Sequence, residues 1–193
     1  MRAQNFEGKG AGDLKEGFYF GRDLPLDHPS AQKGTFGCGP NIYPKGVSNP
    51  AHFRNTIALY HATMSRDVLQ VLALILNLSP NAFDEFGENA LAILRLLHYP
   101  PQPPDASEDE RGIGAHTDFG GLQVYDSPMS TWIDVAPTPG AYVVNLGNLM
   151  MRWTNDRYVS NLHRVINTSG RERYSIPFFF SGNPDCVVKC LRR

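Results

Sequence analysis

The chain has 193 residues, of which 41% are hydrophobic and 19% are charged, and its formal net charge at pH 7 is -1. This length predicts a single domain with a substantial core. The balanced, scattered charges exclude the basic surface by which proteins bind nucleic acid or anionic membranes. No segment approaches the roughly 18 apolar residues of a membrane span. The three cysteines are expected as free thiols, and together these features predict a soluble, cytoplasmic protein.

The first 50 residues are rich in glycine and proline, as in Lys33-Gly-Thr-Phe-Gly-Cys-Gly-Pro40. This composition predicts loops and turns with one short strand. We therefore expect residues 1–50 to be a partial N-terminal segment that wraps the rest of the protein. Residues 51–193 are expected to form a helix and a β-fold, within a single domain overall.

A long helix is predicted to begin at Ser48-Asn49-Pro50, which combines a polar cap candidate with a proline suited to the first helical position. Apolar residues then recur every three or four positions, which indicates a helix with one apolar face. These residues are Ile57, Tyr60, Met64, Val68, Leu72 and Ile75. Ser79-Pro80 repeats the start signal and predicts a short second helix from Pro80 to about Asn89.

Short strand-like runs separated by turn residues follow in the second half of the chain. They cover Gly112 to His116, Leu122 to Tyr125, Trp132 to Val135, Ala141 to Leu146, Asn161 to Ile166 and Tyr174 to Phe180. Several short strands without intervening helices favour an antiparallel sandwich or barrel, with the N-terminal helices packed on its outside.

A possible metal site begins at Gly114-Ala-His-Thr-Asp118. Residues two apart in a strand project to the same face, so His116 and Asp118 could present an imidazole and a carboxylate to one point. The only later histidine is His163, which also lies in a predicted strand. Two imidazoles and one carboxylate can form the facial triad that leaves three positions open on iron(II).

A possible anion site follows in Gly170-Arg-Glu-Arg-Tyr-Ser175. Arg173 and Ser175 share one face if this run is a strand. A fixed guanidinium and a hydroxyl make a bidentate seat for a carboxylate, which lysine would provide less well.

Several segments together closely resemble the isopenicillin N synthase-like family of iron(II)- and 2-oxoglutarate-dependent dioxygenases. The resemblance runs from about Leu14 to Asp185 and is most specific from Leu94 onward. The segments are Ala115-His-Thr-Asp-Phe-Gly120, Pro139-Gly-Ala-Tyr-Val-Val-Asn-Leu-Gly147, Arg152-Trp-Thr-Asn-Asp-Arg-Tyr158, Leu162-His-Arg-Val165 and Arg171-Glu-Arg-Tyr-Ser-Ile-Pro-Phe178.

The resemblance implies a fold that is mainly β with N-terminal helices: a distorted double-stranded β-helix, or jelly roll, backed by a long helix. It also implies that His116, Asp118 and His163 are the iron ligands. Arg173 and Ser175 match the residues that bind the distal carboxylate of 2-oxoglutarate, and Tyr99 matches a tyrosine that helps hold it. The family's frequent asparagine two residues before that tyrosine is Leu97 here.

The chain departs from the family pattern at Gly120-Gly121. In relatives the His-x-Asp segment is followed by a further apolar strand and an acidic turn before the Leu-Gln-Val strand, whereas here the two glycines join the ends directly. The missing strand lies, in the family fold, between the strand of Arg173 and the one that corresponds to Ala141–Leu146. The chain also resembles a form shortened at both termini.

The sequence therefore favours a dioxygenase that uses iron(II), 2-oxoglutarate and dioxygen to hydroxylate, desaturate or cyclise a small organic molecule. No catalytic residue beyond the metal ligands is predicted, and protein partners are not indicated. One alternative is a catalytically silent or truncated relative of the same family. Another is an iron-dependent oxidase of the same fold that does not use 2-oxoglutarate, because the same arginine and serine can seat a substrate carboxylate.

Overall fold

The computed structural model describes residues 15–101, 122–165 and 171–191. Their contacts group into two compact units. The first unit consists of the described residues of Met1–Gly17, Leu96–Pro177 and Val188–Arg193. The second unit consists of those of Phe18–Arg95 and Phe178–Val187. No boundary between the units falls at residue 50, so the predicted wrapping segment and single domain stay predictions.

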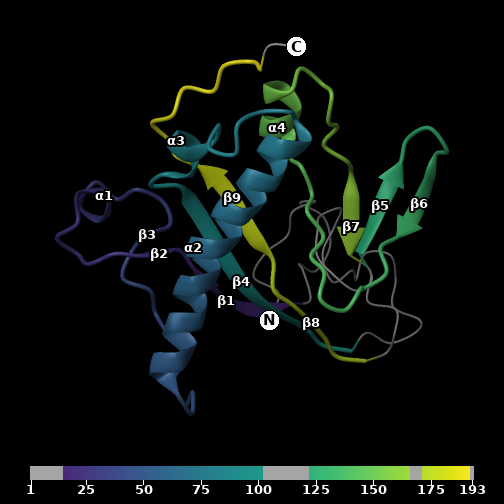
Figure 1. The fold of residues 1–193 in the computed structure, drawn as a ribbon. Coiled ribbons are helices and arrows are strands. Elements are labelled where there is room, and N and C mark those ends of the chain that lie inside the picture. Colours follow the sequence, from purple (N-terminus) through teal and green to yellow (C-terminus); the bar gives the residue numbers. More distant parts are fainter. Residues whose placement is uncertain (1–14, 102–121, 166–170, 192–193) are drawn as a thin grey trace. The chain divides into compact units, whose positions relative to one another are not determined.

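The second unit combines a long helix with an antiparallel pair, β4 and β9, and a short parallel pair, β2 and β3 (Figure 1). Residues Leu91 to Leu94 of strand β4 pair with strand β9, and β1 is the other neighbour of β4. The elements of this part of the chain are β1 (Glu16–Phe20), β2 (Arg22–Asp23), α1 (Pro29–Gln32), β3 (Cys38–Gly39), α2 (Pro50–Ile75), α3 (Asp84–Gly87), β4 (Leu91–Tyr99) and β9 (Phe178–Gly182).

Helix α2 begins and ends where its local sequence predicts. The Asn49 side chain accepts a hydrogen bond from the backbone N–H of His52 at 3.0 Å, and Pro50 occupies the first turn. At the other end Asn77 has a positive φ of 57°, and the N–H of Leu78 donates to the carbonyl of Ala73 at 2.8 Å. This is a Schellman-type stop with asparagine in the left-handed position. Among the described residues, no helix is both long and apolar enough to span a bilayer.

The buried face of α2 differs in part from the predicted one. Ile57 is buried as expected, but Leu69 and Ala73 are the other buried residues, while Ile75 is 52% exposed. The reason is a neighbour that periodicity does not reveal: α2 packs against α3, where a side-chain carbon of Leu69 lies close to Gly87. The helix also contacts the strands, since the His61 ring lies edge-on to Phe178 at 5.3 Å between centroids.

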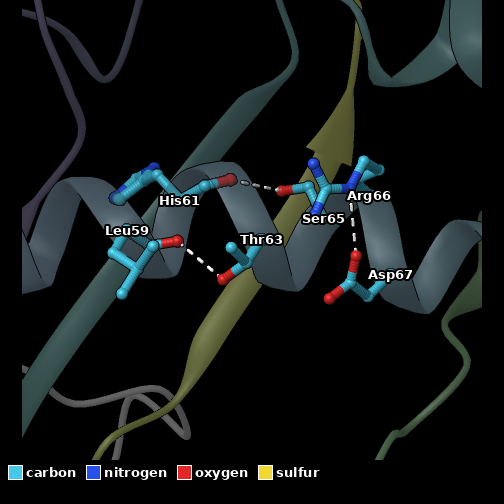
Figure 2. A network of polar contacts seen from close by, with 6 residues as sticks. All are labelled: Leu59, His61, Thr63, Ser65, Arg66 and Asp67. Carbon is cyan, nitrogen blue, oxygen red and sulfur yellow. Dashed lines mark hydrogen bonds and ion pairs between the residues drawn. The ribbon is translucent and has the colours of Figure 1, made fainter.

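Polar side chains in the middle of α2 make their hydrogen bonds and ion pair within the helix itself (Figure 2). Thr63 Oγ1 donates to the carbonyl of Leu59 at 2.7 Å, and Ser65 Oγ donates to that of His61 at 3.0 Å. Arg66 pairs with the adjacent Asp67, and both side chains are more than 60% exposed. Hydroxyls bonded back to the helix and an exposed ion pair contribute little to a site or to stability. We therefore do not assign a functional site to residues 59–67 of α2.

The first unit contains an antiparallel sheet of three strands in the order β6-β5-β7 (Figure 1). These are β5 (Leu122–Asp126), β6 (Thr131–Asp134) and β7 (His163–Val165). Val124 of β5 lies opposite Ile133 on one side and His163 on the other. Leu122 and Val165 are buried on the same face as His163, because alternate residues share a face. The short helix α4 (Asn148–Trp153) also belongs to this unit.

A second pair of strands in the first unit joins residues 97–99 of β4 to β8 (Arg173–Ser175). The predicted strand Tyr174–Phe180 is thus two strands, β8 and β9, which pair with different parts of β4. Pro177 lies at the interruption, and a proline cannot donate to a ladder. Strand β4 is not predicted from the sequence, because its residues are mostly apolar and lack the strict alternation of apolar and polar side chains that marks a half-buried strand.

Three further predictions about elements need correction. The second helix is only the four residues of α3, because Ser79 Oγ donates to the Asn81 side chain at 2.6 Å and the preceding residues form turns. Residues 141–146 form no strand within the described part of the chain. Strand β7 is shorter than Asn161–Ile166. The predicted strand Gly112–His116 lies outside the described residues.

Candidate functional site

The three residues predicted to hold 2-oxoglutarate come together on one face of the β4–β8 pair. Tyr99 lies directly opposite Arg173, and Leu97 lies opposite Ser175. Residues two apart in a strand share a face, so this register places Tyr99, Arg173 and Ser175 on the same side. All three are buried, with exposed fractions of 0%, 8% and 5% respectively. We call Tyr99, Arg173 and Ser175 the carboxylate seat.

The geometry within the carboxylate seat orients the arginine. The guanidinium carbon of Arg173 lies 4.6 Å from the centre of the Tyr99 ring, within the range of a cation–π contact. The planar guanidinium is thereby held against an aromatic surface that restricts its rotation. A fixed guanidinium fork is the arrangement that binds a carboxylate with two parallel hydrogen bonds.

The serine of the carboxylate seat is suited to a ligand. Ser175 Oγ is buried and makes no hydrogen bond with any other described residue. A buried hydroxyl without a partner costs about 1 to 3 kcal/mol, and such groups call for an explanation. An anion bound to Arg173 would give this hydroxyl an acceptor. The residues of the seat therefore fit the distal carboxylate of 2-oxoglutarate.

The opposite face of the same strands carries an exposed polar cluster. His98 and Tyr174, which are register partners, stack with ring centroids 4.7 Å apart. His98 Nδ1 lies 2.9 Å from Glu16 Oε1, and the Tyr174 hydroxyl donates to Glu172 at 2.9 Å. The hydrogen bond to Glu172 raises the pKa of Tyr174. These contacts fix the β4–β8 register from the outside and leave the inner face to the seat.

His163 is held in a tautomer suited to a metal. It begins β7, opposite Val124, and its Nδ1–H donates to the backbone carbonyl of Asn161. In metal sites a histidine typically donates one ring N–H to a carbonyl or carboxylate and binds the metal ion through its other ring nitrogen. His163 thus fits the role of an iron ligand through its Nε2.

The other two predicted iron ligands, His116 and Asp118, lie outside the described residues. Among the residues that are described, no group of three His, Cys, Asp or Glu side chains could hold a metal ion. The three-ligand set of His116, Asp118 and His163 therefore stays a prediction.

A cavity of about 730 Å³ lies within the second unit, between α2 and the loops around residues 21–43 and 83–92. Its size suits a small molecule, but two of the charged groups on its wall already have protein partners. Arg22 donates to the Asn89 side chain at 3.1 Å, and Asp23 accepts from the Tyr43 hydroxyl at 2.7 Å. The described residues that line this cavity include none of the predicted site residues. We therefore assign the candidate site to the first unit.

Comparison with known proteins agrees with this geometry. The 2OG-Fe(II) oxygenase superfamily matches residues 90–182, a range that includes the carboxylate seat and His163. Residues 90–182 belong to the 2OG-Fe(II) oxygenase superfamily. The name of this superfamily states its two cofactors, 2-oxoglutarate and iron(II), which are the two that the seat and His163 fit.

Curated relatives of this chain are longer than it is. It is 53% identical to the 2-oxoglutarate-Fe(II) type oxidoreductase hxnY of Emericella nidulans, matching 99% of this chain and 59% of that protein. It is 44% identical to the 2-oxoglutarate-dependent dioxygenase citB of Monascus ruber, matching all of this chain and 64% of that protein. The chain therefore spans about three fifths of the length of these relatives.

The same alignments show that this chain is also shorter within the matched region. The match to the Emericella nidulans protein covers 206 positions, 13 more than the 193 residues of the whole chain. The match to the Monascus ruber protein covers 211 positions, 18 more than the chain has. Each relative thus has at least that many residues where this chain has none, which is enough for the strand and turn predicted to be missing at Gly120-Gly121.

A solved structure gives the fold of the family. A full-length protein of Neurospora crassa in complex with alpha-KG and thymine matches 93% of this chain and 57% of its own, with a TM-score of 0.75 and 29% sequence identity. Alpha-KG, or alpha-ketoglutarate, is 2-oxoglutarate. This likeness confirms the predicted fold class, a mainly β jelly roll with N-terminal helices.

Proposed function

We propose that the chain provides part of an iron(II)- and 2-oxoglutarate-dependent dioxygenase that oxidises a small organic molecule. The observation that carries the proposal is the carboxylate seat, where Arg173 shares a buried face with Tyr99 and with a Ser175 hydroxyl that has no partner among the described residues. The names of the relatives support the same activity. The thymine bound to the Neurospora crassa protein supports a small molecule as the class of substrate.

In this proposal Arg173 and Ser175 bind the distal carboxylate of 2-oxoglutarate, and Tyr99 backs the guanidinium. His116, Asp118 and His163 hold the iron. When bound, iron and 2-oxoglutarate supply the oxidising chemistry with dioxygen, while the protein supplies orientation and a site protected from water. Hydroxylation, desaturation and ring closure all remain within this proposal, because the fold does not select among them.

The chain's own residues contribute mainly by alignment. A carboxylate fixed at one end by Arg173 directs the other end of 2-oxoglutarate toward a single position, which lowers the entropy lost on reaching a reactive geometry. Burial strengthens this charge-assisted contact, since the local dielectric constant is lower than that of water. The hydrogen bond from His163 Nδ1 to the backbone carbonyl of Asn161 fixes the orientation of the imidazole ring.

Two alternatives rest on specific observations. The residues missing inside the matched region favour a catalytically silent or truncated relative, because the loss of a core strand opens the sheet. The carboxylate seat is equally suited to the carboxylate of a substrate, which favours an iron-dependent oxidase that does not use 2-oxoglutarate.

An anaerobic absorption titration separates these readings. Iron(II) and then 2-oxoglutarate are added to the purified chain, and the weak visible band of a chelated 2-oxo acid is followed to saturation. We expect a band in the unaltered chain, none in His163→Ala, and an unchanged band in the control Val71→Ala on the exposed side of α2. A folded chain without the band would contradict the proposal in favour of the silent form. A chain that oxidises a substrate without forming succinate and carbon dioxide would be an oxidase.

A further inference from the structure

A chain of side chains crosses all three strands of the β6-β5-β7 sheet. Gln123 of β5 stands opposite both Asp134 of β6 and Arg164 of β7. Its Nε2 donates to Asp134 Oδ1 at 2.7 Å, and its Oε1 accepts from Arg164 Nε at 2.7 Å. Both ends of one amide group are therefore used, and they tie the two outer strands to the middle one. We call Asp134, Gln123 and Arg164 the cross-strand relay.

The arginine of this relay is held by a second contact. The guanidinium carbon of Arg164 lies 4.1 Å from the centre of the Trp132 ring, and Trp132 lies 5.1 Å from the Tyr125 ring. Stacking on an aromatic face and a hydrogen bond from Nε together restrict a guanidinium plane, which a lysine could not reproduce. Arg164 is thus fixed both along the sheet and perpendicular to it.

The relay lies on the opposite side of β7 from His163. Neighbouring residues of a strand project to opposite faces, so Arg164 anchors the outer face at the residue next to the predicted iron ligand. Strand β7 has only three residues, and within the described part of the chain it pairs with β5 alone. So short a ladder has few backbone hydrogen bonds to resist sliding or twisting, and a side-chain anchor beside His163 has a correspondingly large effect.

We propose that Arg164, through Gln123 and Asp134, is a positioning residue that holds His163 in place for iron. This inference rests on the proposed function, because it takes His163 as a metal ligand. Residues that orient a ligand from behind typically change metal affinity by roughly 10 to 100-fold when they are lost. The relay is expected to act within that range and to leave the 2-oxoglutarate seat unaltered.

Polarity swaps within the relay give a sharp test. In Gln123→Glu the carboxylate still accepts from Arg164 but faces Asp134 without a proton between them, so one connection is broken. Asp134→Asn keeps an oxygen that accepts from Gln123 and retains the relay. In the double variant Gln123→Glu with Asp134→Asn, the new asparagine amide donates to the new glutamate, and both connections are restored. A general loss of stability would not be reversed in this way.

The measurement is an anaerobic titration with cobalt(II), which binds at iron sites and reports its coordination through visible d–d bands. We expect affinity to fall about 10-fold in Gln123→Glu and in Arg164→Lys, to stay near that of the unaltered chain in Asp134→Asn, and to return in the double variant. The d–d bands should shift in the weakened variants. Leu69→Ala, in the buried face of α2, is the control for lost stability and should leave affinity unchanged.

Two outcomes would overturn the proposal and are distinguishable. If cobalt(II) binding to the unaltered chain does not depend on His163, as tested with His163→Ala, the proposed function fails and the positioning role fails with it. If binding depends on His163 but Gln123→Glu and Arg164→Lys bind as tightly as the unaltered chain, only the positioning role is overturned.

Discussion

Strand β8 and residues 141–146 belong to the same unit and show what makes a strand in this protein. Residues 141–146, Ala-Tyr-Val-Val-Asn-Leu, have a composition typical of a strand, yet they form no strand pairing with the described residues, and Tyr142 is 61% exposed. Strand β8, Arg-Tyr-Ser, has a weaker pattern, yet it pairs with β4 and buries Arg173 and Ser175. A neighbour with free backbone groups decides the outcome more than the side chains do.

The missing neighbour has a specific candidate. The strand that the sequence predicts to be missing at Gly120-Gly121 would lie, in the fold of the family, between the strand of Arg173 and the segment 141–146. The relatives have at least 13 and 18 additional residues within the matched region. This comparison predicts that residues 141–146 lack a strand because their partner is missing, while the carboxylate seat persists because it depends on β4.

The largest expected effect comes from supplying that partner. Inserting the additional residues of the Emericella nidulans relative between Gly120 and Gly121 should raise the free energy of unfolding by several kcal/mol, a large part of the roughly 5 to 15 kcal/mol typical of a domain. Urea unfolding measures the gain, and hydrogen exchange at residues 141–146 shows whether they become protected. A glycine-serine insertion of equal length is the control, and the comparison is wrong if both insertions give the same stability.

The next effect concerns the arginine of the carboxylate seat. Arg173→Lys keeps the charge but loses the planar fork and its contact with Tyr99, so the affinity for 2-oxoglutarate should fall by roughly 10 to 100-fold. Calorimetric titration in the presence of iron(II) measures the change. Tyr174→Phe, on the outer face of the same strand, is the matched control and should bind normally. If Arg173→Lys bound 2-oxoglutarate as tightly as the unaltered chain, Arg173 would not be the residue that binds its distal carboxylate.

A smaller effect is expected from Ser175→Ala, which should not lower the stability of the ligand-free chain but should weaken its binding of 2-oxoglutarate. Without ligand, Ser175→Ala removes a buried hydroxyl that lacks a described partner, so the melting temperature should stay level or rise. With 2-oxoglutarate, the variant loses one hydrogen bond, and affinity should fall by about 3 to 10-fold. Thermal unfolding with and without 2-oxoglutarate measures both. A lower melting temperature in the absence of ligand would indicate a structural role for this hydroxyl.

The smallest expected effect is a pH dependence of the free energy of unfolding. It arises from His61, which lies in the second unit. Burial lowers the pKa of His61, whose Nε2–H donates to the carbonyl of Phe20 at 3.2 Å. The unfolded chain therefore binds a proton at this residue more readily than the folded chain does, so stability is complete above the ordinary histidine pKa of about 6.5 and falls as the pH decreases below it. His61→Gln keeps a donor without the charge and should flatten this part of the unfolding profile. An unchanged profile would assign the pH dependence to other groups.

The sequence predicted the features that depend on local signals. Helix α2 followed from Pro50 and the spacing of apolar residues, and its cap residue Asn49 acts as expected. The shared face of Arg173 and Ser175 followed from strand alternation. Both patterns are complete within a few consecutive residues, which is why one sequence was sufficient.

Features that depend on distant partners could not be predicted. The alignment of Tyr99 with Arg173 and the relay from Asp134 to Arg164 are set by strand register, which no local pattern in this chain determines. The failure of residues 141–146 to pair has the same cause. His116 and Asp118 lie outside the described residues, so their place beside His163 stays a prediction.

The central claim is that the carboxylate seat binds the distal carboxylate of 2-oxoglutarate although the chain is shorter than its relatives within the matched region. The most direct test compares 2-oxoglutarate with 2-oxopentanoate, in which that carboxylate is replaced by a methyl group, in the unaltered chain and in Arg173→Leu, with iron(II) present and oxygen excluded. We predict that the unaltered chain prefers 2-oxoglutarate by at least about 10-fold and that Arg173→Leu shows no preference. The same preference in both chains would contradict the account.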